Sequence, residues 1–264
     1  MIEGWWVFPL LGLAAGVLAG LLGIGGGLVL IGALVWLLPV YGIPESAAMH
    51  AALASSLASI VLTASSSARS HHRRGSVLWP TVAWMVPGLV LGGWLGSLVA
   101  VALQGEVLRW CVALYCFVVA AQVAFGGPRG GAGQPGLAPV GWPMTAAGGG
   151  IGAISAVVGI GGGSMTVPLL VWRGVVPVRA VGTSSACGIF IGLASAAGYA
   201  VHAPAGALPA HAVGYVYLPA AIGIAFASVL AAPLGTRLAH AISGTALKRV
   251  FAVFMVLVGI SVLL

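Results

Sequence analysis

Acidic side chains are almost absent from this chain of 264 residues. There are three, Glu3, Glu45 and Glu106, and each lies near the edge of an apolar run. Sodium ions and protons are usually carried through membranes by Asp or Glu side chains at mid-membrane depth. The sequence therefore argues against that kind of ion coupling. Two alternatives remain: transport is driven by the gradient of the solute itself, or protons cross the membrane bound to the solute.

Charged residues of either sign are also scarce, at 5% of the chain, whereas hydrophobic residues make up 61%. This balance excludes a soluble domain and is typical of a multi-pass membrane protein. A bilayer core of about 30 Å needs about 20 apolar residues per helix, and several runs are that long. The net charge of +7 fits Lys and Arg retained on the cytoplasmic side of a bacterial inner membrane, rather than a nucleic-acid partner.

Cysteine is rare too. An odd number, three, all in apolar runs, argues against a disulfide framework and favours packing. No metal site and no cofactor is predicted. The N-terminus lacks the positive residues of a signal peptide, so the first apolar run is expected to stay in the protein.

Glycine is abundant, and two GIGGG stretches, residues 23–27 and 159–163, interrupt apolar runs too long for one span. Dense glycine disfavours a helix, and a broken helix inside a membrane is tolerated where protein or water satisfies its backbone. The helix after each break presents free N–H groups, which favour an anion. The alternative is close helix packing around a kink. Neither stretch is a Walker loop, since no Gly-Lys-Ser/Thr follows, and neither lies in a βαβ pattern.

The pattern of the first half recurs in the second. Gly16, Gly20 and the first GIGGG match Gly152, Ala156 and the second GIGGG at one constant offset. The segment Ala54-Ser55-Ser56 matches Gly182-Thr183-Ser184 at a slightly smaller offset, because the intervening loop is shorter in the second half. Duplication of this kind is common in secondary transporters. We predict a first transmembrane repeat over residues 1–125, a Gly/Pro linker over 126–141 and a second repeat over 142–264.

Positive charges predict how the runs cross the membrane. If all eight segments spanned, six Lys and Arg residues would lie outside and four inside, against the positive-inside rule. If the second GIGGG run instead returns to its own side, nine lie inside and only Arg109 outside. By symmetry the first run is treated in the same way. The fold class predicted is an all-α polytopic membrane protein with two inverted repeats, each a broken re-entrant hairpin plus three transmembrane helices.

Hydroxyl side chains follow the breaks at helical spacing, as in Ser55, Ser59, Thr63 and Ser66. Hydroxyls suit an oxyanion passage because they donate hydrogen bonds without a trapping charge. The alternative is that they join neighbouring helices. The predicted substrate-binding residues are Gly25, Gly26, Gly27, Ser55, Ser56, Gly161, Gly162, Gly163, Ser164, Thr183 and Ser184.

Histidine and arginine supply the remaining candidates. His50, at the start of the second span, is a candidate proton carrier, against the alternative of a capping or interfacial group. The basic loop 69–75 is either an electrostatic funnel for anions or a determinant of orientation and acidic-lipid binding. The funnel residues are Arg69, His71, His72, Arg73 and Arg74.

These motifs resemble the TauE/SafE sulfite exporter family, also described as the toluene-sulfonate uptake permease family, over nearly the whole chain. The resemblance rests on the two glycine stretches, Met49-His50 leading into residues 54–57, and residues 66–75, 180–184 and 232–235. Ser55 stands where a threonine is common. The resemblance implies transport of sulfite or an organosulfonate across the bacterial inner membrane, often outward. Alternating access, with one repeat rocking against the other around both glycine loops, is the expected mechanism.

Two functions from other classes stay open. One is an intramembrane serine hydrolase, in which Ser164 would be the nucleophile and His202, His211 or His240 the base. The other is a membrane accessory subunit without transport. A homodimer is one alternative for the oligomeric state.

Overall fold

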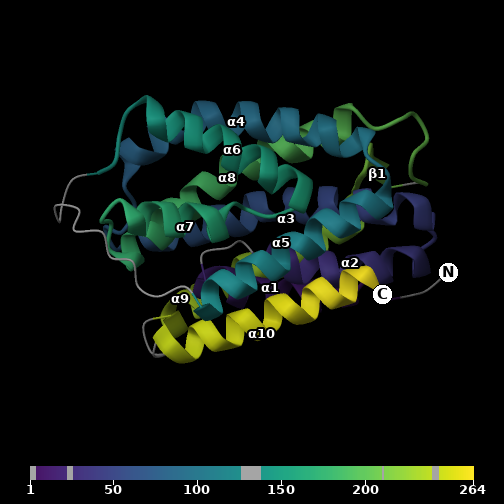
Figure 1. Cartoon of the computed structure of the whole chain (residues 1–264). Coiled ribbons are helices and arrows are strands. Elements are labelled where there is room, and N and C mark those ends of the chain that lie inside the picture. Colours follow the sequence, from purple (N-terminus) through teal and green to yellow (C-terminus); the bar gives the residue numbers. More distant parts are fainter. Residues whose placement is uncertain (1–3, 23–25, 126–137, 210, 240–243) are drawn as a thin grey trace.

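A computed structural model of the chain describes residues 4–22, 26–125, 138–209, 211–239 and 244–264. Within these residues, ten helices run roughly along one common direction, and a short β-hairpin lies at one end (Figure 1). The elements in chain order are α1 (Val7–Leu22), α2 (Gly27–Val40), α3 (Glu45–His72), α4 (Trp79–Ala102), α5 (Gly105–Phe125), α6 (Trp142–Val158), α7 (Gly163–Trp172), α8 (Pro177–Val201), β1 (Ala212–Val213), β2 (Val216–Tyr217), α9 (Leu218–Ala239) and α10 (Gly244–Leu263).

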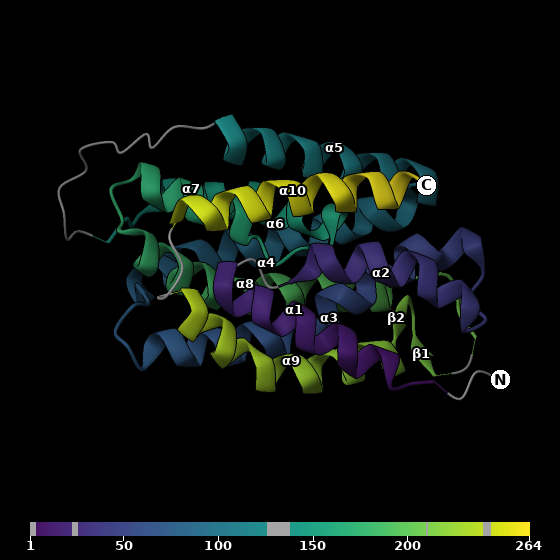
Figure 2. The same ribbon diagram turned by 90° about the horizontal axis from the view of Figure 1, so that it is seen from below.

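The all-α membrane fold is confirmed. Five helices, α3, α4, α5, α8 and α9, are long and apolar enough to cross a membrane within the described ranges. The side chains at the start of α10 lie outside the described residues. The remaining apolar part, Ala252–Leu263, is too short to be included among the five. Helices α5 and α10 pack against each other along one side of the bundle (Figure 2).

Both glycine breaks lie at the tips of helical hairpins. At the open end of the α1–α2 hairpin, the Tyr41 hydroxyl donates to the Gly4 carbonyl at 2.7 Å. At the open end of the α6–α7 hairpin, the Arg173 guanidinium lies 3.8 Å from the Met144 sulfur. Each pair of helices therefore returns to the end from which it starts. The charge count predicts this for the second pair, and symmetry predicts it for the first.

The two hairpins open toward opposite ends. Helices α3 and α8, which follow them directly, are antiparallel: Gly192 of α8 packs on Leu57 of α3, and Ser185 bonds Ser67. The α6–α7 opening lies at the arginine-rich end, defined by Arg69, Arg73, Arg74, Arg173, Arg179 and Arg237. The α1–α2 opening lies at the β-hairpin end, together with β1, β2 and both termini (Figure 1).

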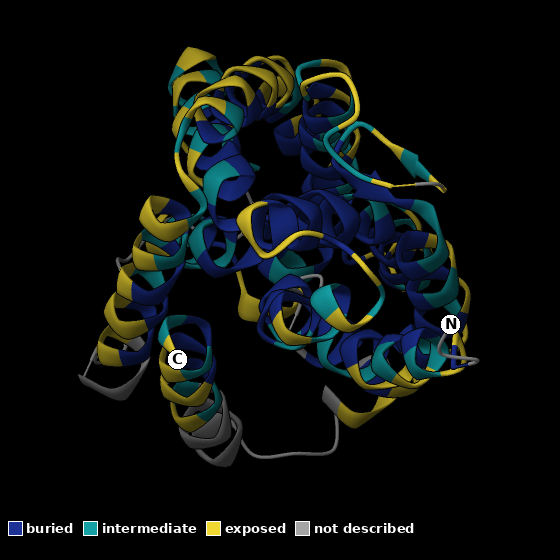
Figure 3. Ribbon diagram, turned by 90° about the vertical axis from the view of Figure 1, so that its right-hand side faces the viewer, coloured by how far each residue is buried: buried dark blue, intermediate teal, exposed yellow. Residues whose placement is uncertain are grey.

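Helices α3 and α8 form the centre of the bundle. In the most apolar stretch of α3, 83% of residues are buried, against 33% in α5. Exposed residues gather on the outer faces of the surrounding helices (Figure 3). Large apolar side chains such as Trp142 and Phe226 are exposed on these outer faces. An apolar surface of this kind is expected where helices face lipid.

Each hairpin packs its first helix against a helix from the other half of the chain. A Cβ at Gly16 of α1 would lie 2.6 Å from the Ser228 carbonyl oxygen of α9, and one at Gly152 of α6 would lie 2.5 Å from the Leu89 carbonyl oxygen of α4. Only glycine permits such close approach of two backbones. The recurrence supports the prediction of two inverted repeats. The division at 1–125 and 142–264 stays a prediction, and residues 126–137 of the expected linker lie outside the described residues.

Two local predictions are wrong. The stretch expected to be a basic loop from Arg69 begins as helix, because α3 continues to His72 and the chain turns only at Gly75, where φ is +67°. The span expected from Val213 begins at Leu218 instead. Gly214, at φ +56°, turns the chain so that Val213 pairs with Val216 in a β-hairpin.

Candidate functional site

The two hairpin tips are built around glycines that no other residue replaces without strain. Gly26 at φ +67° and Gly162 at φ +72° precede α2 and α7, and neither helix has a side-chain cap. A residue with a Cβ rarely adopts this left-handed conformation. Gly25, a predicted binding residue, lies outside the described residues. In the described residues, each tip therefore starts a helix whose first N–H groups receive no cap from a side chain.

The tips meet in the middle of the molecule. A Cβ at Gly27 would lie 2.6 Å from the Gly159 carbonyl oxygen, so the two backbones are in contact. The Ser56 hydroxyl of α3 joins them, at 3.3 Å from the Gly27 carbonyl oxygen and 3.2 Å from that of Gly159. The predicted residues Gly27 and Ser56 are thus brought together with the second glycine stretch.

The start of α7 presents a set of free donors. In the part of the chain that the structure describes, no N–H group from Gly161 to Ser164 donates to a protein acceptor, whereas Met165 and Thr166 both donate to the Gly162 carbonyl. These groups carry the positive end of the helix dipole. Such an arrangement can hold an anion without a charged side chain.

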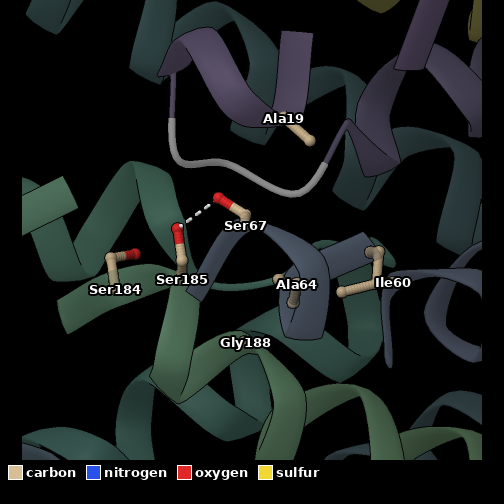
Figure 4. A pocket seen from close by; sticks show the side chains of 8 residues that line it. Ala19, Ile60, Ala64, Ser67, Ser184, Ser185 and Gly188 are labelled. Carbon is tan, nitrogen blue, oxygen red and sulfur yellow. Dashed lines mark hydrogen bonds between the residues drawn. The ribbon is translucent and has the colours of Figure 1, made fainter. Parts of the chain in front are cut away.

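A small cavity lies beside this helix start (Figure 4). Its volume is about 10 Å³, which holds no more than about one water molecule. Ser67 of α3 and Ser185 of α8 face each other across it, with their hydroxyl oxygens 3.0 Å apart. Ser184, Gly161 and apolar side chains complete the lining, and the predicted residue Ser184 is therefore at the cavity. The site is closed in this conformation.

The predicted funnel residues lie on the arginine-rich side of the cavity. His71, one turn beyond Ser67, is 3% exposed and packs against Gly182 of α8. The other predicted funnel residues, Arg69, His72, Arg73 and Arg74, are exposed at that end. Of the five predicted funnel residues, His71 is therefore the buried one, and it lies one turn of α3 from the cavity residue Ser67.

Ser55 and Thr183 have equivalent contacts in the two halves. The Ser55 hydroxyl accepts from the Tyr217 N–H at 3.0 Å, and the Thr183 hydroxyl accepts from the Leu78 N–H at 3.0 Å. Tyr217 and Leu78 directly precede α9 and α4. In this conformation both hydroxyls fix the start of a neighbouring helix, and contact with a solute stays a prediction for them.

We expect Thr183→Val to lower the free energy of unfolding by about 1–2 kcal/mol, because the buried Leu78 N–H loses its acceptor. Thermal unfolding in detergent measures this. The matched control is Thr166→Val, since the Thr166 hydroxyl is buried without a partner among the described residues. Equal stability of the two variants would contradict the capping role.

Other hydroxyls of the predicted stripe join helices. Thr63 bonds Ser228 of α9 and also donates to the Ser59 carbonyl at 3.0 Å, while Ser66 donates to the Val229 carbonyl at 3.0 Å. For these residues the structure favours helix–helix contact, the alternative considered from the sequence.

Ser164 is placed against Tyr115 of α5, and their hydroxyls are hydrogen-bonded. His202 and His211 lie at the β-hairpin end, where His202 bonds the Gly198 carbonyl and His211 contacts Trp5. Within the described ranges, no histidine bonds Ser164. His240 lies outside them.

His50 is separated from the glycine tips. It lies about 9 Å along α3 from Ser56, at about 1.5 Å per residue. Its Nε2 is 3.0 Å from the Leu103 carbonyl oxygen, and its ring stacks on Tyr215. These two groups border a depression of about 650 Å³ that also contains Glu45, Glu106 and Arg109. Burial raises the pKa of the Tyr215 phenol above its ordinary value.

Sequence reasoning did not include Ser67, Ser185 and Ser155 among the site residues. Ser67 and Ser185 line the cavity, and Ser155 lies beside Gly162 in the second tip. Ser67 continues the helical spacing of Ser56, Ser59 and Thr63, which could have indicated it. Ser185 matches Leu57 in the repeat and Ser155 matches Ala19, so duplication gave no signal for either.

Residues 8–262 match the family model described as sulfite exporter TauE/SafE. A curated relative from Haemophilus influenzae, described as a probable membrane transporter protein, is 35% identical over 258 residues. That match covers 97% of this chain and 96% of the relative. No solved structure matches the chain. With its apolar helices and paired glycine hairpins, the chain belongs to the TauE/SafE sulfite exporter family of membrane transporters.

Proposed function

We propose that the protein exports a small sulfur oxyanion, sulfite or an organosulfonate, across the bacterial inner membrane. The observation that carries the proposal is the uncapped start of α7 at the point where both glycine tips meet. Its free N–H groups suit an anion, and hydroxyls of α3 and α8 lie beside them. Glu45 and Glu106, the carboxylates in the described part of the chain, are exposed at one end of the bundle, so neither opposes an anion at the centre.

The direction is argued from charge and from the cavity. The arginine-rich end is cytoplasmic under the positive-inside rule. The cavity extends from the tips toward that end, where Ser67 lies within the last two turns of α3. Exposed Arg69, Arg73 and Arg74 raise the local concentration of anions there. An anion collected on the cytoplasmic side and released on the other is exported.

The helix contacts favour a particular form of alternating access. If one sequence half rocked as a unit, the close α1–α9 and α4–α6 contacts would break. Two bodies that each combine helices from both halves keep those contacts. One body contains α1, α3 and α9, the other α4, α6 and α8, and α3 meets α8 at their boundary around the cavity.

Flux into proteoliposomes tests the function. Purified protein is expected to carry sulfite, with sulfate, thiosulfate and taurine-derived sulfonates compared at two pH values under anaerobic conditions. Protein-free vesicles are the control. The pH comparison shows whether a protonated anion is the species carried, because bisulfite and sulfite interconvert near neutral pH. No flux of any of these anions would refute the proposal and favour an accessory subunit.

A further inference from the structure

Residues of the two halves can be matched by their contacts as well as by their sequence. Gly16 meets the Ser228 carbonyl, and its counterpart Gly152 meets the Leu89 carbonyl. One turn earlier, Gly12 meets the Ile224 carbonyl, and its counterpart Gly148 meets the Met85 carbonyl. Ile224 and Met85 lie one turn before Ser228 and Leu89, so the two helix pairs have the same register. These contacts relate α1 to α6 and α4 to α9. The equivalent capping contacts of Ser55 and Thr183 relate α3 to α8.

This correspondence assigns a counterpart to each residue at the cavity. Ala19 corresponds to Ser155, Ser67 corresponds to Ser195, and Ile60 and Gly188 correspond to each other. The cavity lies on the side of the tips that faces the arginine-rich end. The counterpart residues therefore lie on the side that faces the β-hairpin end. On that side the helices are closely packed: a Cβ at Gly192 would lie 2.9 Å from the Leu57 carbonyl oxygen.

Ser155 and Ser195 are unusual for closely packed residues. Both side chains are 0% exposed, and neither hydroxyl has a hydrogen-bond partner in the described structure. The Ser155 oxygen lies 3.3 Å from the position of a Cβ at Gly162, so it adjoins the uncapped start of α7. The Ser195 oxygen lies 2.9 Å from the position of a Cβ at Gly93 of α4. A buried hydroxyl without a partner is costly, which suggests a partner in another state.

We propose that Ser155 and Ser195 bind the anion when the site opens toward the β-hairpin end, as Ser67 and Ser185 do when it opens toward the arginine-rich end. The proposal rests on the proposed function. It gives the carrier a second set of hydroxyl ligands that the present conformation hides. The species bound is the same oxyanion, handed from one set of donors to the other past the start of α7.

The buried residue His71 has a counterpart on that side. His71 lies one turn beyond Ser67, and Tyr199, also buried, lies one turn beyond Ser195. The Tyr199 hydroxyl donates to the Ala156 carbonyl at 3.1 Å, and its own carbonyl accepts from the Tyr215 N–H at 3.3 Å. These bonds hold the Tyr199 side chain against α6, within the body that contains α4, α6 and α8.

The first test removes the hydroxyls. With sulfite as the transported probe, Ser155→Ala and Ser195→Ala should each lower kcat/KM about tenfold, as expected for loss of about one hydrogen bond to a charged group. Thermal stability should stay the same or rise, because an unpartnered buried hydroxyl is removed. The matched control is Thr81→Val, since Thr81 is equally buried and unpartnered but corresponds to Ala220, which is not at the cavity. Normal kcat/KM in both serine variants would overturn the proposal.

The second test measures access. In a chain whose three cysteines are replaced, Ser67→Cys and Ser195→Cys are labelled in oriented vesicles with a membrane-impermeant thiol reagent. We expect labelling of Cys at 67 from the arginine-rich side only and at 195 from the other side only, each slowed by sulfite. Labelling of both from the same side, or none at 195 during active flux, would overturn the proposal. Absence of wild-type flux would instead count against the proposed function.

Discussion

Oxidation of a Ser67→Cys/Ser185→Cys variant is expected to stop sulfite flux completely, and dithiothreitol is expected to restore it. The two hydroxyl oxygens are 3.0 Å apart, on helices that lie on opposite sides of the cavity. A disulfide of about 2.05 Å between these positions needs only a small adjustment. Because the cavity is too small for the anion, α3 and α8 have to separate in each transport cycle, and a covalent bond between them prevents this.

The native cysteines are replaced first, so that one bond is formed. Flux is measured in proteoliposomes before oxidation, after oxidation and after reduction. The controls are the two single cysteine variants, in which the oxidant should not change the flux measured before oxidation. Full flux by a double variant shown to be oxidised would mean that the anion passes without separation of α3 from α8.

Replacement of Gly162 by leucine is expected to reduce flux to the level of protein-free vesicles. Leucine at φ +72° costs about 1–2 kcal/mol of backbone strain, and its Cβ would lie 2.5 Å from the Ile191 Cδ1 atom. The start of α7 then has to move, and its N–H groups no longer converge on the anion. Gly162→Ala has the same strain with a smaller side chain, and we expect partial flux from it.

Gly42→Leu is the matched control. Gly42 has φ +86°, but nothing lies within 4 Å of its would-be Cβ, so strain is introduced without displacement of a neighbour. Monodisperse elution and a cooperative thermal transition establish that each variant is folded. Normal flux through folded Gly162→Leu would show that the α7 start does not bind the solute.

Much of the fold could be predicted from glycine and arginine. The GIGGG stretches indicate breaks because glycine adds backbone entropy and no packing. The arginine count indicates that the second broken run returns to its own side, and symmetry extends this to the first. The end of α3 could not be placed in the same way. Arg69 to His72 are compatible with either helix or loop, and the helix continues there because His71 packs against Gly182 of α8.

The candidate site was only partly predictable. The main-chain donors followed from the glycine pattern, as did the position of Ser56 at the tips. The pairing of Ser67 with Ser185 depends on the register of two helices that are far apart in sequence, which no local pattern encodes. His50 lies in a different part of the molecule from the tips, so adjacency to the Ser55–Ser56 motif in sequence did not predict adjacency to the site.

The contact between α1 and α9 has a consequence for biogenesis. Gly12 and Gly16 are synthesised near the start of the chain, whereas the carbonyls of Ile224 and Ser228 that they touch are made near its end. The first hairpin therefore enters the lipid long before its packing surface exists, and the glycine face of α1 has to be shielded meanwhile. Insertion chaperones or the translocon itself can provide that shelter. A chain truncated before α9 should consequently be a substrate for membrane quality-control proteases, even though helices α1 to α8 are complete.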